Sequence, residues 1–267
     1  MSGFSADWLA LREPFDLAAR NPDVLGAVAA MVSHQPAITI VDLACGTGST
    51  LRAVAPKLAP RQSWKLIDND LSLLARAAAP PHPPRSAVTA TPVDLAHDLE
   101  AALDGSVDLV TTSALLDIVS EVWLERLVVE IAARRLPLYA ALTYDGRIAF
   151  EPAIAFDADI MAAVNAHQHG DKGFGPALGP DAAAKATTRF TALGYQVITG
   201  FADWSFAPGD AAIQLETVRG WALAAQEILP SARDRVAEWL LRRQQLVHAG
   251  SSTIRVGHVD FLVVPSG

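Results

Sequence analysis

The residues of this sequence whose types and spacing best suit chemistry gather around two glycines. Residues 38–51 read ITIVDLACGTGSTL, in which a β-branched run leads into Gly46 and Gly48. Because glycine has no Cβ, both positions allow a sharp turn and a close approach of the backbone to a ligand. A helix that begins after Gly48 would direct its unpaired N–H groups toward that ligand. The segment therefore predicts a ligand-binding turn between a strand and a helix.

A second acidic position lies twenty residues after Gly48. Asp68 ends the run WKLID, which has the composition of a strand. A carboxylate at the tip of the second strand can accept hydrogen bonds from both ribose hydroxyls of an adenosine-type cofactor. The alternative role is a helix cap, which Asp68, Asn69 or Asp70 would each fill. We expect Asn69 or Asp70 to cap the following helix and Asp68 to bind the ribose.

Two candidates for contact with a second substrate follow later strands. Asp117 lies in the loop 113–117, where it suits either an acceptor-side role or the cap of a helix that begins near Ser120. Tyr144 ends another predicted strand and is expected to face the same edge of the sheet. The Asp145–Gly146 pair that follows is typical of a turn, so we expect Asp145 to be structural.

A polar, glycine-rich segment at residues 165–176 supplies two further candidates. His167 and His169 are expected to bind the acceptor or act as a base, and the alternative is an ordinary surface turn. We do not expect them to bind a metal together with Asp171, because a spacing of two does not place side chains on one helix face.

Cys45 between the strand and the glycines, and two arginines of the N-terminal helices, could also take part in this chemistry. Cys45 is expected to be a small buried side chain rather than a nucleophile, since no base neighbours it in sequence. Arg12 and Arg20 suit pairing with a cofactor carboxylate or a substrate. For Arg12 we favour a surface ion pair with Glu13 or Asp16.

The elements that position these residues follow an alternating pattern. Short apolar runs alternate with helical stretches, which is typical of a parallel sheet covered by helices. We expect strands at Ala37–Ala44, Ser63–Ile67, Ala87–Val93, Val107–Ser113, Pro137–Tyr144, Tyr195–Phe201 and Thr253–Val264. We expect helices at Ser5–Arg20, Pro22–Ser33, Ser49–Lys57, Leu71–Ala78, Ala96–Leu103, Glu121–Arg134, near Asp157–His167, and at Pro180–Leu193, Pro208–Ile228 and Pro230–Ala249.

Composition narrows the class of protein. The chain has 267 residues and a formal net charge of −8, and no domain boundary is evident, so we expect one domain over residues 1–267. The negative charge argues against a nucleic-acid partner, because phosphate binding depends on clustered Lys and Arg. No apolar run is long enough to span a membrane. The single cysteine and the charged N-terminal segment predict a cytoplasmic protein without disulfides.

The motifs around the glycines resemble those of a known family. A dinucleotide fingerprint requires a third glycine where this chain has Leu51. Residues 41–48 (VDLACGTG) instead resemble motif I of the class I S-adenosylmethionine-dependent methyltransferases. Residues 66–70, 91–95 and 108–117 resemble the family's next three motifs in order, so the resemblance covers about residues 37–120.

The resemblance implies S-adenosylmethionine as the cofactor, with Asp94 meeting the adenine amine and Leu95 packing on the ring. The cofactor-binding residues it implies are Asp42, Ala44, Cys45, Gly46, Thr47, Gly48, Asp68, Asn69, Asp94, Leu95 and Ser113. Methyl transfer rarely needs a metal, and none is expected here.

The resemblance also implies an α/β fold. We expect a Rossmann-like sheet of seven strands in the order 3-2-1-4-5-7-6, with the last strand antiparallel and helices on both faces. A helical cap at residues 1–35 and an insertion at residues 146–179 after the fifth strand would close over the site and select the substrate.

The sequence thus predicts methyl transfer to a small-molecule acceptor by in-line displacement, with Asp117, Tyr144, His167 and His169 on the acceptor side. The main alternative is a module that binds S-adenosylmethionine or S-adenosylhomocysteine without catalysis and has a regulatory role. A third hypothesis is aminopropyl transfer, for which a relative with this fold places paired carboxylates around a polyamine. The sequence shows no convincing pair of this kind. The identity of the acceptor is left open, and so is the oligomeric state, for which a homodimer is one option.

Overall fold

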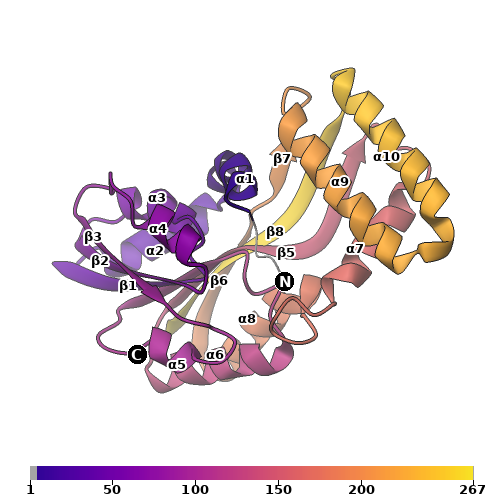
Figure 1. Cartoon of the computed structure of the whole chain (residues 1–267). Coiled ribbons are helices and arrows are strands. Elements are labelled where there is room, and N and C mark those ends of the chain that lie inside the picture. The colour runs from indigo at the N-terminus through magenta and orange to yellow at the C-terminus, as the bar shows by residue number, and fades with distance from the viewer. Residues whose placement is uncertain (1–4, 267) are drawn as a thin grey trace.

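One mixed sheet lies at the centre of the protein, whose computed structural model describes residues 5–266 (Figure 1). The strands are β1 (Ala37–Leu43), β2 (Arg61–Asp68), β3 (Ser86–Pro92), β4 (Leu109–Ser113), β5 (Leu138–Glu151), β6 (Tyr195–Phe201), β7 (Trp204–Phe206) and β8 (Thr253–Pro265). Their order is β3-β2-β1-β4-β5-β8-β6, with β7 also paired to β8. Strands β1 to β5 pair in parallel, and β8 is antiparallel to both β5 and β6. The predicted order with a reversed last strand is confirmed, and the short β7 is an additional eighth strand.

The register of the parallel strands brings their carboxyl ends to one edge. Leu43 at the end of β1 lies opposite Ile67 of β2 and Thr112 of β4. Strand β1 (AITIVDL) is mostly apolar because helices cover both faces of a parallel sheet. The loops that leave β1, β2 and β4 therefore emerge side by side, which is the usual ligand-binding edge of an open α/β sheet.

Helices cover both faces of the sheet. They are α1 (Ala6–Ala19), α2 (Pro22–Val32), α3 (Ser49–Val54), α4 (Leu71–Ala77), α5 (Leu99–Ala102), α6 (Glu121–Ala133), α7 (Asp157–Gln168), α8 (Ala182–Ala192), α9 (Ala211–Ile228) and α10 (Arg233–His248). Buried residues of α2, α3 and α4 share one apolar cluster, and those of α5, α6 and α8 share another on the opposite face. No helix within residues 5–266 is long and apolar enough to cross a membrane. Residues 1–4 and 267, which the predicted domain includes, lie outside the described residues.

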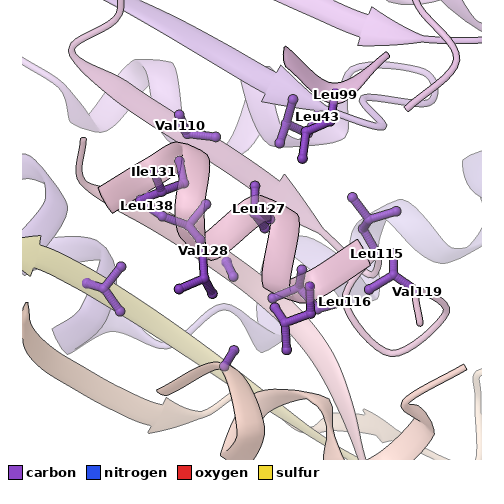
Figure 2. Packing of buried hydrophobic residues seen from close by; sticks show 14 of the residues in the cluster. Leu43, Leu99, Val110, Leu115, Leu116, Val119, Leu127, Val128, Ile131 and Leu138 are labelled. Carbon is purple, nitrogen blue, oxygen red and sulfur yellow. The ribbon is translucent and has the colours of Figure 1, made fainter. Parts of the chain in front are cut away.

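The cluster beneath α6 shows how the sequence pattern produces this packing. Leu127 and Ile131 lie four positions apart on one face of α6 and point toward Val110 of β4 and Leu138 of β5 (Figure 2). Spacings of three and four residues place side chains on the same helix face. At about 25 cal/mol per Å² of buried apolar surface, each such side chain contributes about 1.5–3 kcal/mol to folding.

One end of the sheet extends into an arm, which we define as residues 145–168 and 204–256. The long strands β5 and β8 pair as far as Glu151 and Thr253, and α7, α9 and α10 pack on them with β7 (Figure 1). Arg243 of α10 is fully buried and forms an ion pair with Asp157 at the start of α7. The arm thus holds α9 beside the binding edge of the sheet.

The predicted turn at Asp145–Gly146 is wrong, because β5 continues through it. The register shifts between Tyr144 and Ile148, and Gly146 has a φ of +85°, which together form a bulge. Asp145 forms an ion pair with Arg147 two residues later. A turn-forming pair was accommodated within a strand because a bulge also uses a glycine with positive φ.

Candidate functional site

A cleft of about 1510 Å³ opens at the carboxyl ends of the parallel strands. Its wall is formed by α1, the glycine turn, the loops after β2, β3 and β4, residues 167–174, α9 and parts of β5 and β8. Pockets for a single small ligand commonly measure about 300–1,000 Å³. The cleft therefore has room for two ligands beside each other.

The glycine turn forms one end of this cleft. Ala44, Gly46 and Gly48 have φ values of +53°, +54° and +84°, and the Gly48 N–H donates to the Cys45 carbonyl at 2.8 Å. Positive φ is easily adopted by glycine and strained for alanine. Helix α3 begins immediately afterwards without a side-chain cap. Ala44, Cys45, Gly46 and Thr47 of the turn line the cleft, whereas Gly48, which was also expected to bind the cofactor, lies outside its wall.

Helix α1 lies over the glycine turn. A Cβ on Gly46 would come within 3.3 Å of the Leu9 side chain. Glu13 of α1 forms an ion pair with Arg52 of α3, and Arg52 donates to the Thr47 carbonyl at 2.7 Å. The N-terminal segment is therefore tied to the turn by polar as well as apolar contacts.

Asp68 ends β2 directly beside the turn. Its carboxylate accepts the Gly46 N–H at 2.9 Å and the Asp70 N–H at 3.0 Å. Each oxygen takes one backbone hydrogen bond and keeps a second acceptor position. Asp70 caps α4 by accepting the N–H groups of Ser72 and Leu73. Capping thus belongs to Asp70, and Asp68 and Asn69 line the cleft.

The loops after β3 and β4 supply the neighbouring wall. Leu95 is buried at the cleft, and its carbonyl accepts a hydrogen bond from the Trp123 indole. Asp94 is about half exposed and pairs with His97, which lowers the pKa of Asp94. Ser113 lines the cleft at the end of β4. The structure thus brings together most of the residues that the resemblance implied for the cofactor.

Asp42 lies beneath the turn and outside the cleft wall. Its Oδ1 accepts a hydrogen bond from Thr111 at 2.8 Å, whereas Oδ2 is buried without a partner among the described residues. Burial raises the pKa of Asp42 to about 7, and nearby Asp68 adds to the increase, while Thr111 and Arg20 oppose it. A buried oxygen without a partner is costly. The predicted cofactor contact of Asp42 is therefore not supported, because its side chain is buried outside the cleft wall.

The remaining predictions around the turn concern reactivity and metals. Cys45 is buried, and burial raises the pKa of its thiol, so it is a small apolar side chain rather than a nucleophile. Asp171 accepts the N–H groups of Gly173 and Gly175 within its own loop. Within residues 5–266 no group of three His, Cys, Asp or Glu side chains is arranged to hold a metal ion.

The sequence predicted a surface ion pair for Arg12. This prediction is wrong, because Arg12 is buried. It is buried against the cleft, its Nε donates to Asp16 at 2.9 Å, and its guanidinium lies 5.3 Å from the Trp204 ring centre. Asp16 also accepts the Trp204 indole N–H at 3.0 Å. The face of α1 that carries these residues is turned inward because β7 packs against it.

Arg20 lies in a buried polar network behind the cleft. Its guanidinium donates to the Tyr139 hydroxyl at 3.3 Å and contacts the hydroxyls of Thr50 and Ser113. Tyr139 in turn donates to Asp260 of β8 at 3.1 Å. This network connects the N-terminal helices to the centre of the sheet and to Ser113 in the cleft wall.

Asp117 lies in the cleft wall rather than at a helix end. Ser120 caps α6 by accepting the Trp123 N–H, so the alternative role of Asp117 as cap is wrong. Its Oδ1 is buried without a hydrogen-bond partner within residues 5–266. Burial raises the pKa of Asp117 to about 6, with Arg12 acting in the opposite direction. A carboxyl group with this pKa can accept a proton near neutral pH.

Tyr144 and His258 face each other across β5 and β8 in the same wall. The Tyr144 hydroxyl donates to Asn165 of α7 at 2.6 Å, and burial raises the pKa of this phenol. The rings of Tyr144 and His258 lie 6.1 Å apart, and Trp204 lies 4.8 Å from His258. This half of the cleft is thus largely aromatic.

The two histidines of the predicted insertion take different positions. His167 lines the cleft, where its Nε2 contacts Glu227 of α9 and its Nδ1 contacts the Lys172 ammonium, both at 3.2 Å. His169 packs against Gly179, and its Nδ1 contacts the Ala177 carbonyl at 3.3 Å. His169 is outside the cleft wall, so its contacts indicate a role in fixing the loop.

Several cleft residues were missed as candidates by the sequence interpretation. They are Asp16, Thr217, Gly220, Val256 and His258. No local motif marks them, because α1, β7, α9 and β8 converge only in the folded chain. One signal was available in the sequence: His258 and Asp260 are polar residues within the mostly apolar run 256–264.

Comparisons with known proteins identify the fold. No protein-family model matches the chain, and no curated protein matches it in sequence. The structure is similar to that of a cyclopropane-fatty-acyl-phospholipid synthase-like protein from Lactobacillus casei, with a TM-score of 0.54 and 16% identity over 99% of this chain and 95% of that one. It is also similar to the YcgJ protein from Bacillus subtilis, with a TM-score of 0.51 and 9% identity over 92% of this chain and 100% of that one. Together with the strand order, these similarities show a Rossmann-like α/β fold, which is the fold that the resemblance in sequence motifs implied.

Proposed function

We propose that this protein is an S-adenosylmethionine-dependent methyltransferase that acts on a small-molecule acceptor. The observation that carries the proposal is one large cleft with two distinct ends. The glycine turn and Asp68 lie at one end, and Asp117 and Tyr144 belong to the other.

The residues of the first end fit the cofactor. Asp68 has free acceptor positions for two ribose hydroxyls, and buried Leu95 offers an apolar surface to the adenine. The glycine turn allows the cofactor to approach the backbone closely. Asn69, Asp94 and Ser113 complete this set at the wall of the cleft. When bound, S-adenosylmethionine supplies a methyl group activated by its sulfonium.

The other end of the cleft positions the acceptor and takes its proton. Asp117 and Tyr144 would hold the acceptor in line with the methyl group that the bound cofactor would supply, so that the group could be transferred by displacement from sulfur. Alignment of the reacting atoms provides most of the rate increase in such a displacement. A protonated acceptor also needs a base. Asp117 suits this role because it lies in the cleft wall and burial raises its pKa to about 6, so that its carboxylate can take up a proton near neutral pH.

Two segments complete the proposed site. The cap predicted at residues 1–35 places Leu9 over the glycine turn and Arg12 against the acceptor end. The insertion predicted at residues 146–179 brings His167 and Lys172 to the cleft. We infer that both segments exclude water from the site and that His167 contacts the acceptor.

A methyl-transfer assay separates this proposal from a binding module without catalysis. Purified protein is incubated with S-adenosylmethionine that carries a tritiated methyl group, together with a library of small compounds. Each compound carries a hydroxyl, an amine, a thiol or an acidic C–H group. An enzyme transfers label to at least one compound, and Asp117→Asn should reduce that transfer by about 10²–10⁴-fold, the usual contribution of a general base. Binding of the cofactor without any transfer would favour the alternative of a regulatory module.

A further inference from the structure

His258 is a buried side chain whose role is not explained by the proposed reaction. It belongs to β8, lies in the cleft wall and is only 6% exposed. Its Nδ1 lies 3.1 Å from the Val256 carbonyl. Because a carbonyl oxygen can only accept, Nδ1 must carry the proton, and this contact fixes the tautomer of the neutral ring.

The other ring nitrogen of His258 is left with a free lone pair. Within residues 5–266, Nε2 has no hydrogen-bond partner. It is also not among the fully enclosed polar atoms that lack a partner, so it reaches open space. His258 lines the cleft at the side formed by β5 and β8, opposite Tyr144.

The surroundings of His258 keep the ring neutral. Burial lowers the pKa of His258 to about 3, and the cations of Arg12 and Arg147 act in the same direction. The Val256 carbonyl and Asp203 act in the opposite direction but do not compensate. At physiological pH the ring therefore presents an acceptor to the cleft and never a second donor.

We propose that Nε2 of His258 selects acceptors that present an uncharged O–H or N–H group beside the reacting atom. This inference rests on the proposed function, because it concerns the acceptor end of the same cleft. A carboxylate or an ether oxygen would place a second lone pair against Nε2, which leaves both groups without a donor. An ammonium group would lie near the Arg12 guanidinium, which is close enough to affect the charge of His258.

The neighbours of His258 add to this selection. Trp204 and Tyr144 surround the imidazole with aromatic surface, and Val256 extends the apolar wall. An acceptor that fits is therefore largely apolar apart from its donor group. Sites built to pair with a substrate hydroxyl reject analogues that lack it far more strongly than apolar pockets reject a change of size.

The test uses the full-length protein and three small probes of similar shape: phenol, toluene and benzoate. Affinities are measured by NMR titration of protein with ¹⁵N-labelled histidine, with and without S-adenosylhomocysteine. We expect phenol to bind about tenfold more tightly than toluene, as one additional hydrogen bond allows. Phenol, and not toluene, should shift the Nε2 resonance of His258. His258→Phe should abolish the preference, whereas His248→Phe at the exposed end of α10 should retain it.

Either of two results would overturn the inference: equal binding of phenol and toluene to the wild-type protein, or tightest binding of benzoate. A retained preference in a folded His258→Phe variant would also overturn it. If that variant does not fold, the wild-type preference and the Nε2 shift decide the matter alone. A calorimetric titration of the same preparations with S-adenosylhomocysteine keeps the two proposals separate. If S-adenosylhomocysteine does not bind, the proposed function is contradicted, but the comparison of phenol with toluene still tests His258.

Discussion

The ion pair between Asp157 and Arg243 holds the arm together, and its removal should strongly destabilise the protein. Asp157 accepts the Ile154 N–H at 2.7 Å and the Trp239 indole N–H at 2.8 Å in addition to the guanidinium of Arg243. Arg243 is fully buried and has one further acceptor, the Pro152 carbonyl. Asp157→Ala would leave a buried cation with too few partners, which costs about 3–5 kcal/mol. For a chain of this size that corresponds to a fall in Tm of about 6–20 °C.

Differential scanning calorimetry and urea unfolding measure this effect, with Asp159→Ala as the matched control. Asp159 lies in the same turn of α7 but is exposed, so its replacement should change stability by no more than about 0.5 kcal/mol. The double variant Asp157→Ala/Arg243→Met should recover part of the loss, since no charge is then left buried alone. A cost for Asp157→Ala equal to that of Asp159→Ala would refute the reasoning. A double variant whose loss of stability exceeds the summed losses of the two single variants would refute it as well.

Three further predictions concern the cleft and its support. Asp68→Ala should weaken binding of S-adenosylhomocysteine by about tenfold or more, measured by calorimetry. The control Asp70→Ala should leave this affinity unchanged and cost only about 1 kcal/mol of stability through the lost helix cap. Unchanged affinity of Asp68→Ala would end the ribose assignment. Because the pKa of Asp42 is raised to about 7, folded protein retains a proton that the unfolded chain releases above about pH 4, and stability falls as the pH rises across this window. Asp42→Asn should flatten that fall in urea titrations at pH 5 and pH 8, and identical pH profiles would contradict it. Gly220 lies within α9 and lines the cleft, and a Cβ added to it would meet nothing within 4 Å. Gly220→Ala should therefore stabilise the protein by about 1 kcal/mol but reduce methyl transfer. A gain in both stability and methyl transfer would show that the acceptor does not reach α9.

The sequence predicted the parts of the site that depend on local pattern. The glycine turn follows from Gly46 and Gly48 after a β-branched run, and the structure gives both glycines a positive φ. Asp68 follows from its place at the end of the next strand. Because neighbouring parallel strands end at one edge, residues far apart in sequence were expected to lie together, and the register of β1, β2 and β4 confirms this.

The acceptor end was harder to predict because it forms only through tertiary contacts. Arg12 had the spacing of a surface ion pair with Asp16, and the pair is buried because α1 packs against β7. The strand β7 itself is three residues long, too short for a periodic pattern. The same limit applies to His258, whose lone pair is significant only because Val256 fixes the tautomer and the cleft lies on the other side.

The most direct test of the central claim is a calorimetric titration of the folded wild-type protein with S-adenosylhomocysteine and S-adenosylmethionine. The account predicts saturable one-to-one binding of both, with micromolar affinity, at the end of the cleft that contains Asp68. Absence of binding by either compound, with the protein shown to be folded, would mean that the glycine turn is only part of the scaffold and would contradict the proposed function.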